Sequence, residues 1–132
     1  MKDLKHARQM LGFARRDFKA LTGMKDEETF ADEVFGFMAQ QAVEKAFKAW
    51  LSEMGIKYPK SHDLKELAGL LRKHHESIPE KFLSLLNLSD FAVQLRYDSY
   101  DAMAGGLDRE MIIQKVSELI ETVEAKLAEI KK

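Results

Sequence analysis

The stretch VFGFMAQQAVEKAFKAWLSEM, residues 34–54, decides the fold because it is apolar on two sides at helical spacing. Apolar and small residues recur every three to four positions along it, which is the repeat of an α-helix. A helix with two apolar faces is buried on both sides, so we expect this one to be central. It is predicted to run from the acidic residues 26–28 to about Gly55. One stripe is formed by Val34, Met38, Ala42, Ala46 and Ala49, and the other by Val43, Phe47, Trp50, Leu51 and Met54.

Two further helices are predicted on either side of this segment. Residues 4–21 carry a single apolar stripe, and Gly23 is expected to end the helix that they form. After a loop, Ser61 is expected to cap a shorter third helix, because serine side chains satisfy the free amides at a helix start. His74 and His75 mark the end of that helix.

The C-terminal part of the chain predicts two more helices. One is expected from Ser77 toward Arg96, and the last from an N-cap at Asp108 to the end of the chain. The connections are short and the apolar stripes are one-sided. The predicted fold class is therefore all-α: an antiparallel up-and-down bundle of four long helices plus one short helix, forming a single domain over residues 1–132.

Composition excludes several functional classes. The 132 residues include 21 Lys and Arg against 22 Asp and Glu, a net charge of -1, which disfavours a general nucleic-acid coat. Without cysteine, neither disulfides nor thiolate metal sites are available. No secretory leader and no run of roughly 18 apolar residues is visible, so we expect a soluble cytoplasmic protein with no membrane contact. The histidines lack the i,i+4 spacing of a helical metal site, and the common hydrolase, dehydrogenase and zinc-protease motifs are absent. No metal site is predicted.

A polar strip interrupts the apolar central helix. Gln41, Glu44, Lys45 and Lys48 fall within about one third of the helix circumference. One interpretation is an exposed face with an ordinary Glu44–Lys48 ion pair at i,i+4. The other is a site that faces a phosphate.

A second polar cluster lies where the fourth helix is expected to end. It consists of Arg96, Tyr97, Asp98, Tyr100 and Asp101. A guanidinium suits a phosphate and tyrosine rings suit a stacked base, so the cluster is compatible with a nucleotide. The alternative is an arginine that stabilises a helix C-terminus, with tyrosines that pack the adjacent loop.

Three runs together resemble the HEPN family. They are FMAQQAVEKAFKAWL at residues 37–51, YPKSHDLKELAGLL at 58–71 and FAVQLRYDS at 91–99, in the order and at the separations that the family shows. The resemblance spans most of the chain. It implies an antiparallel helical bundle, often a dimer, that is commonly encoded with a minimal nucleotidyltransferase and is associated with nucleotide binding or with toxin–antitoxin pairs.

The resemblance also implies site residues. The acid and base of the family's helix correspond to Glu44 and Lys48, and its arginine corresponds to Arg96. Ribonuclease members add a histidine five to seven residues after the arginine, but this chain has Asp101, Ala102 and Met103 there. Since an unperturbed aspartate does not titrate near neutrality as histidine does, RNA cleavage is disfavoured.

We derive three hypotheses from these observations. In the first, the protein binds a nucleotide such as ATP, or presents substrate, for a separately encoded minimal nucleotidyltransferase. It has no intrinsic cofactor, and the partner supplies the chemistry. The phosphates would contact Arg96, Lys48 and Lys45, and the base would stack on Tyr97 or Tyr100, with Glu44 as the acid of the site.

The second hypothesis is a ribonuclease toxin with a rearranged site. Its weak catalytic candidates are Arg96 and Asp101, and either Asp101 or His62 would replace the missing histidine. The third is a structural homodimer in which the second face of the central helix packs against its copy. No catalytic activity of the chain on its own is expected, and RNA is the less favoured ligand.

Overall fold

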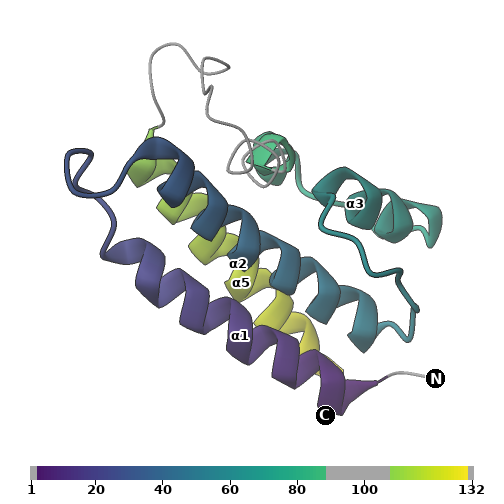
Figure 1. Cartoon of the computed structure of the whole chain (residues 1–132). Helices are drawn as coiled ribbons and strands as arrows, with labels where there is room; N and C mark the ends of the chain where they lie inside the picture. Colours follow the sequence, from purple (N-terminus) through teal and green to yellow (C-terminus); the bar gives the residue numbers. More distant parts are fainter. Residues whose placement is uncertain (1–2, 89–107, 131–132) are drawn as a thin grey trace.

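The computed structural model describes residues 3–88 and 108–130, and every regular element within these ranges is a helix (Figure 1). The all-α prediction is confirmed for this part of the chain. Within it, no helix combines the length and the apolar character that a membrane crossing requires. In chain order the elements are α1 (Leu4–Thr22), α2 (Asp32–Glu53), α3 (Leu64–Lys73), the 3-10 helix η1 (Glu80–Leu88) and α5 (Arg109–Ile130).

Helix α2 is the central element, as its two apolar stripes predict. It packs against α1, α3, η1 and α5, and in Figure 1 it lies between α1 and α3. Only the first residue of one stripe, Val34, is exposed. The predicted dimer interface on the second face of this helix is wrong, because elements of the same chain cover that face. Fully buried residues from the two stripes are Ala42, Val43, Ala46, Phe47, Ala49, Trp50 and Leu51.

Polar contacts fix how the three long helices lie against one another. The amide of Asp3 donates to the carbonyl of Ser52 at 2.9 Å, so the start of α1 lies beside the end of α2. At the other end of the molecule, the buried guanidinium of Arg109 donates to the carbonyls of Met24 and Phe30 at 2.7 and 2.6 Å. The start of α5 therefore holds the connection between α1 and α2.

Helix α2 begins six residues later than the acidic cluster predicts. Residues 26–29 form a turn in which the Asp26 carboxylate accepts from the Glu28 amide at 3.0 Å and from the Thr29 hydroxyl at 2.5 Å. An aspartate that bonds to its own following backbone offers the chain an alternative to a helix. The acidic residues of the first turn are instead Asp32 and Glu33.

The third helix also starts later than predicted, because Asp63 and not Ser61 is its N-cap. The Asp63 carboxylate accepts from the Lys65 amide at 2.9 Å, which is the contact of an N-cap with the second helical residue. The Ser61 hydroxyl accepts from the Asp63 amide at 3.1 Å and shapes the turn before the helix. The predicted end at His74 and His75 is confirmed, since α3 ends at Lys73.

The predicted fourth long helix is a nine-residue 3-10 helix over the part that the structure describes. Its buried residues Phe82, Leu85 and Leu88 are three positions apart, and such residues align on one face when the helix has three residues per turn. Residues 89–107, into which the helix was expected to continue, lie outside the described ranges. The structure thus describes three long α-helices, one shorter α-helix and one 3-10 helix, and the continuation of the fourth long helix beyond Leu88 stays a prediction.

Candidate functional site

The carboxylate of Glu44 is the centre of a buried polar cluster. Its side chain is only 4% exposed. One oxygen, Oε2, accepts from Lys48 Nζ at 2.9 Å. The other, Oε1, accepts from Gln40 Nε2 at 3.0 Å and lies 2.9 Å from His62 Nδ1. A buried carboxylate is tolerated only with such partners, and this one has three.

The sequence places these groups together through helical spacing and one loop contact. Gln40, Glu44 and Lys48 are four residues apart on α2, so their side chains lie in one row. His62 comes from the loop just before α3, and the Gln40 amide donates to its carbonyl at 2.9 Å. Gln40 therefore holds the loop backbone while Glu44 holds the imidazole.

The charge of Glu44 is maintained by its hydrogen bonds. Burial acts to raise the pKa of this carboxyl, but the bonds from Lys48, His62 and Gln40 outweigh burial, so its pKa lies below its ordinary value. Glu44 is thus ionised at neutral pH. A charged carboxylate can only accept hydrogen bonds, so Nδ1 of His62 is the donor in their contact.

That contact leaves the other imidazole nitrogen of His62 available. The His62 side chain is 68% exposed, unlike those of Glu44 and Lys48. With Nδ1–H held by a carboxylate, Nε2 of the neutral ring is an acceptor in solvent. Nε2 is therefore the polar atom that this ring presents to solvent beside the cluster.

A second pair, Tyr58 and His6, adjoins this cluster and was not predicted from the sequence. Lys48 Nζ lies 5.5 Å from the centre of the Tyr58 ring, within the range of a cation–π contact. The Tyr58 hydroxyl lies 2.6 Å from His6 Nε2, and the two rings stack with centroids 6.1 Å apart. Burial raises the pKa of Tyr58, and the charges of Glu44 and Asp3 raise it further, while a bond with Ser52 lowers it. The hydroxyl therefore stays protonated, and it is hydrogen-bonded to His6 Nε2.

A hollow of about 450 Å³ opens beside Tyr58. This volume is within the range of small-ligand sites. Because Tyr58 borders the hollow and also contacts Lys48, it joins the hollow to the Glu44 cluster. The hollow is lined by Asp3, His6, Ser52, Gly55, Ile56, Lys57 and Tyr58.

The structure separates the predicted polar strip into two parts. Glu44 and Lys48 belong to the cluster, and Gln41 supports it by donating to Gln40 Oε1 at 2.8 Å. Lys45 instead pairs with Asp17 of α1, which makes it a bridge between two helices. The interpretation as an exposed face with an ordinary ion pair is wrong for Glu44, which is buried.

All residues of the second predicted cluster lie outside the described residues, namely Arg96, Tyr97, Asp98, Tyr100 and Asp101. No group of three or more potential metal ligands occurs within residues 3–88 and 108–130.

Tyr58 lies in one of the runs that carry the family resemblance, whereas His6 is 52 residues away along the chain, so only the fold relates them.

Comparison with known proteins gives one match. The family model of the HEPN domain matches residues 7–126, which is most of the chain. No curated protein and no solved structure matches.

Proposed function

The chain belongs to the HEPN family, and from this premise we propose that it binds a nucleotide, or presents substrate, for a separately encoded minimal nucleotidyltransferase. The observation that carries the proposal is the Glu44 cluster. One buried carboxylate holds Lys48 and the exposed His62, and Lys48 lies against the ring of Tyr58, which borders the hollow. An ammonium group, an imidazole and an aromatic ring are groups that bind a phosphate and a base.

Charge accounts for phosphate binding. Glu44 contributes one negative charge, while Lys48 and protonated His62 contribute two positive ones, so the cluster carries a net positive charge when His62 is protonated. Arg96, the family's arginine by resemblance, would add a third.

The hollow beside Tyr58 is the proposed place for the base or ribose. The Tyr58 ring already receives Lys48 on one face, and its hydroxyl is fixed by His6. Tyr97 and Tyr100, which the sequence predicts for the base, stay predictions. Lys45 is not part of this proposal, because Asp17 already occupies its ammonium group.

The test is calorimetric titration of ATP and GTP, with magnesium, into wild type, Lys48→Ala and Arg96→Ala. We expect each variant to bind about tenfold more weakly, as for the loss of one charged hydrogen bond to phosphate. Lys73→Ala is the matched control, because Lys73 is exposed at the end of α3. Equal binding by wild type and both variants would contradict the proposal. If wild type alone does not bind, the titration is repeated on a complex with the nucleotidyltransferase.

The contact between His62 and Glu44 supports a second candidate, a ribonuclease. His62 would take the proton of a 2′-hydroxyl on Nε2, the 2′-oxygen would attack phosphorus, and the 5′-oxygen would leave with a proton from water. The products would be a 2′,3′-cyclic phosphate and a 5′-hydroxyl. Purified protein that cleaves RNA, with activity lost in His62→Ala and kept in His74→Ala, would favour this candidate. Intact RNA would remove it.

A further inference from the structure

The lining of the hollow beside Tyr58 contains one carboxylate, that of Asp3. Two hydrogen bonds fix this residue in place. Its amide donates to the carbonyl of Ser52 at 2.9 Å, and its Oδ1 accepts from the amide of His6 at 3.1 Å. Ser52 and His6 line the same hollow. The carboxylate is therefore held at the wall by the backbone of neighbouring lining residues.

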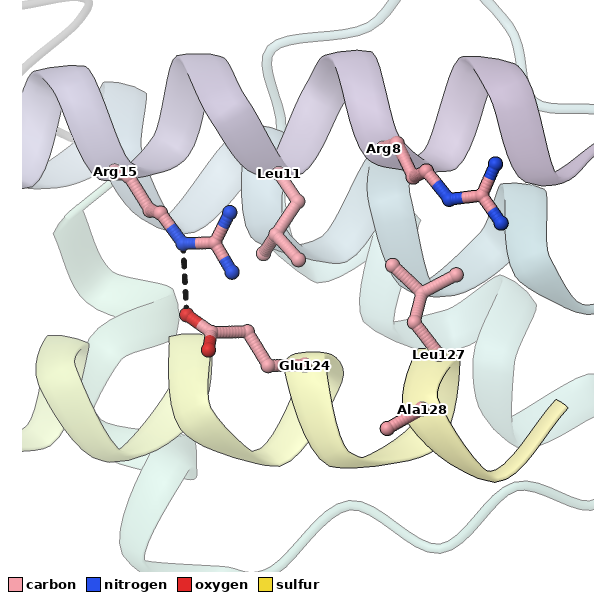
Figure 2. Close-up of a pocket in the computed structure, with 6 residues that line it drawn as sticks. All are labelled: Arg8, Leu11, Arg15, Glu124, Leu127 and Ala128. Carbon is pink, nitrogen blue, oxygen red and sulfur yellow. Dashed lines mark hydrogen bonds and ion pairs between the residues drawn. The ribbon is translucent and has the colours of Figure 1, made fainter. Parts of the chain in front are cut away.

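Figure 2 shows a second hollow, which lies between α1 and α5 and also has one carboxylate in its lining, that of Glu124. This carboxylate already accepts from Arg15 Nε at 2.8 Å. The two leucines there, Leu11 and Leu127, are 3% and 5% exposed, so they leave little carbon surface for a ligand to cover. The hollow beside Tyr58 has both an aromatic ring and a carboxylate in its lining, and it is the better place for a base.

The acceptor capacity of Asp3 bears on which base fits. An ionised carboxylate has about four acceptor positions and no donor, so the bond from His6 leaves acceptor positions on both oxygens. Guanine is the common base with two adjacent N–H donors on one edge, N1–H and N2–H. Adenine and cytosine each place an amino group beside a ring nitrogen that accepts, and uracil places one N–H between two carbonyls. A carboxylate therefore forms two parallel hydrogen bonds with guanine and one with each of the others.

We propose that the hollow beside Tyr58 selects guanine through Asp3. The inference rests on the proposed function, in which the phosphate lies at Lys48 and the base in the hollow. N1–H and N2–H of guanine would donate to the two oxygens of Asp3. The ammonium group of Lys57, in the same lining, is a donor that suits the neighbouring O6 of the base. The hollow, at about 450 Å³, has room for a base and its ribose.

The experiment titrates GMP and AMP separately into the full chain and follows backbone amide resonances by NMR. The two ligands share the phosphate and the ribose, so a difference in affinity reports the base alone. We expect GMP to shift amides of residues 3–6 and 55–58, and AMP to bind about tenfold more weakly or worse.

Asp3→Asn is the decisive variant. Asparagine caps a helix as well as aspartate does, so the start of α1 should be kept. Its amide group presents an N–H to one of the two guanine donors, and the preference for GMP should be lost. XMP has a carbonyl oxygen where guanine has its amino group. The variant should therefore bind XMP at least about tenfold better than wild type does.

Asp108→Asn is the matched control. Asp108 Oδ1 also accepts from the amide three residues ahead, that of Met111, at 3.1 Å, but it lies at the other end of the molecule. This variant should keep the ratio of GMP to AMP affinity of the wild type. A change of that ratio in Asp108→Asn equal to the change in Asp3→Asn would overturn the proposal.

The remaining outcomes separate this inference from the proposed function. A preference for GMP that is lost in Asp3→Asn, together with a gain of XMP binding, supports the inference. Equal binding of GMP and AMP, or a preference that survives in Asp3→Asn, overturns it and leaves nucleotide binding intact. An absence of shifts at the hollow with either ligand also overturns it. A guanine preference that persists while Lys48→Ala binds GMP as wild type does would contradict the proposed phosphate site and leave the inference standing.

Discussion

The indole nitrogen of Trp50 donates to Oε1 of Glu76 at 2.9 Å, and this bond ties the buried C-terminal part of α2 to the segment just after α3. The same carboxylate oxygen lies 2.9 Å from Lys126 Nζ of α5, which in turn lies 5.0 Å from the centre of the Trp50 ring. Three helices therefore meet at one carboxylate. Its ionisation state affects the packing of all three.

Acid should weaken the fold through Glu76. Burial acts to raise the pKa of this carboxyl, but the bonds from Lys126 and Trp50 lower it more, so its pKa lies below its ordinary value of 4.5. The unfolded chain then binds this proton more readily than the folded one. The stabilisation by Glu76 is present above the unfolded value and is lost as pH falls through the folded value.

We therefore expect Glu76→Gln to flatten the dependence of unfolding free energy on pH between about 6 and 3, measured by urea denaturation followed by circular dichroism. Glu129→Gln, at an exposed position of α5, is the control and should follow wild type. An equally steep acid dependence in Glu76→Gln would show that other carboxylates carry the effect.

The sequence predicted the elements whose signals are local. The two apolar stripes of α2 and the helix end at Gly55 were predicted correctly. Both the helical repeat and a helix-ending glycine are signals that depend on residues close together in the sequence. A buried tryptophan ring nitrogen usually has a hydrogen-bond partner. That Glu76 is the partner of Trp50 was not predicted, because the two residues are 26 positions apart and only the packing of α3 on α2 joins them.

For the candidate site, too, the sequence predicted the contacts between residues close together on one helix and missed those that depend on the fold. Glu44 and Lys48 were found together because four residues separate them on one helix. The roles of Gln40 and His62 depend on where the loop before α3 lies, which no residue pattern specifies. Lys45 has the same charge as Lys48 and adjoins the same acid along the chain, but it lies about 100° around α2 from Glu44 and pairs with Asp17 of α1. Side-chain direction therefore decides which lysine joins the Glu44 cluster, where residue type does not.

Arg109 is expected to be the most sensitive charged residue outside the candidate site. Its side chain is 4% exposed, and besides the carbonyls of Met24, Asp26 and Phe30 it bonds to the Asp32 carboxylate at 2.9 Å. Arg109→Met would leave these acceptors unsatisfied and should cost about 3 kcal/mol of unfolding free energy. Arg15→Met removes an exposed pair with Glu124 and should cost less than about 1 kcal/mol. Urea denaturation measures the unfolding free energy of both variants. Similar losses in the two would contradict the expectation that Arg109 is the more sensitive residue.

Lys48 should control the ionisation of Glu44. The pKa of Glu44 is below its ordinary value because the bond from Lys48 is the largest of the effects that oppose burial. Lys48→Met keeps the length of the side chain but removes that bond, so the pKa of Glu44 should rise. The measurement is a titration of the side-chain carboxyl resonance by carbon-13 NMR. Lys73→Met is the control, and an unchanged Glu44 titration in Lys48→Met would mean that His62 and Gln40 suffice.

The ends of α2 and α3 provide a matched pair of backbone tests. Gly55 follows α2 with a φ of 75°, and the amide of Ile56 bonds back to the carbonyl of Leu51 at 2.9 Å. His75 follows α3 in the same way with a φ of 64°. The amide of Glu76 bonds back to the carbonyl of Leu71 at 2.9 Å. Both helices end in a residue with left-handed backbone conformation, which favours glycine. Helix α2 has a glycine at this position, whereas α3 has His75.

Opposite effects are expected from exchanging the residue types. Gly55→Ala places a Cβ in the left-handed region and should cost about 1 kcal/mol. His75→Gly removes such a Cβ, and after the greater freedom of the unfolded chain is subtracted it should gain roughly 0.5 kcal/mol. Urea denaturation of both variants tests this. A loss of stability in His75→Gly would mean that the imidazole stabilises the fold through contacts that outweigh the backbone strain. Glu76, which accepts the hydrogen bond from Trp50, directly follows His75. The His75→Gly variant therefore also tests whether this hydrogen bond depends on the turn at His75.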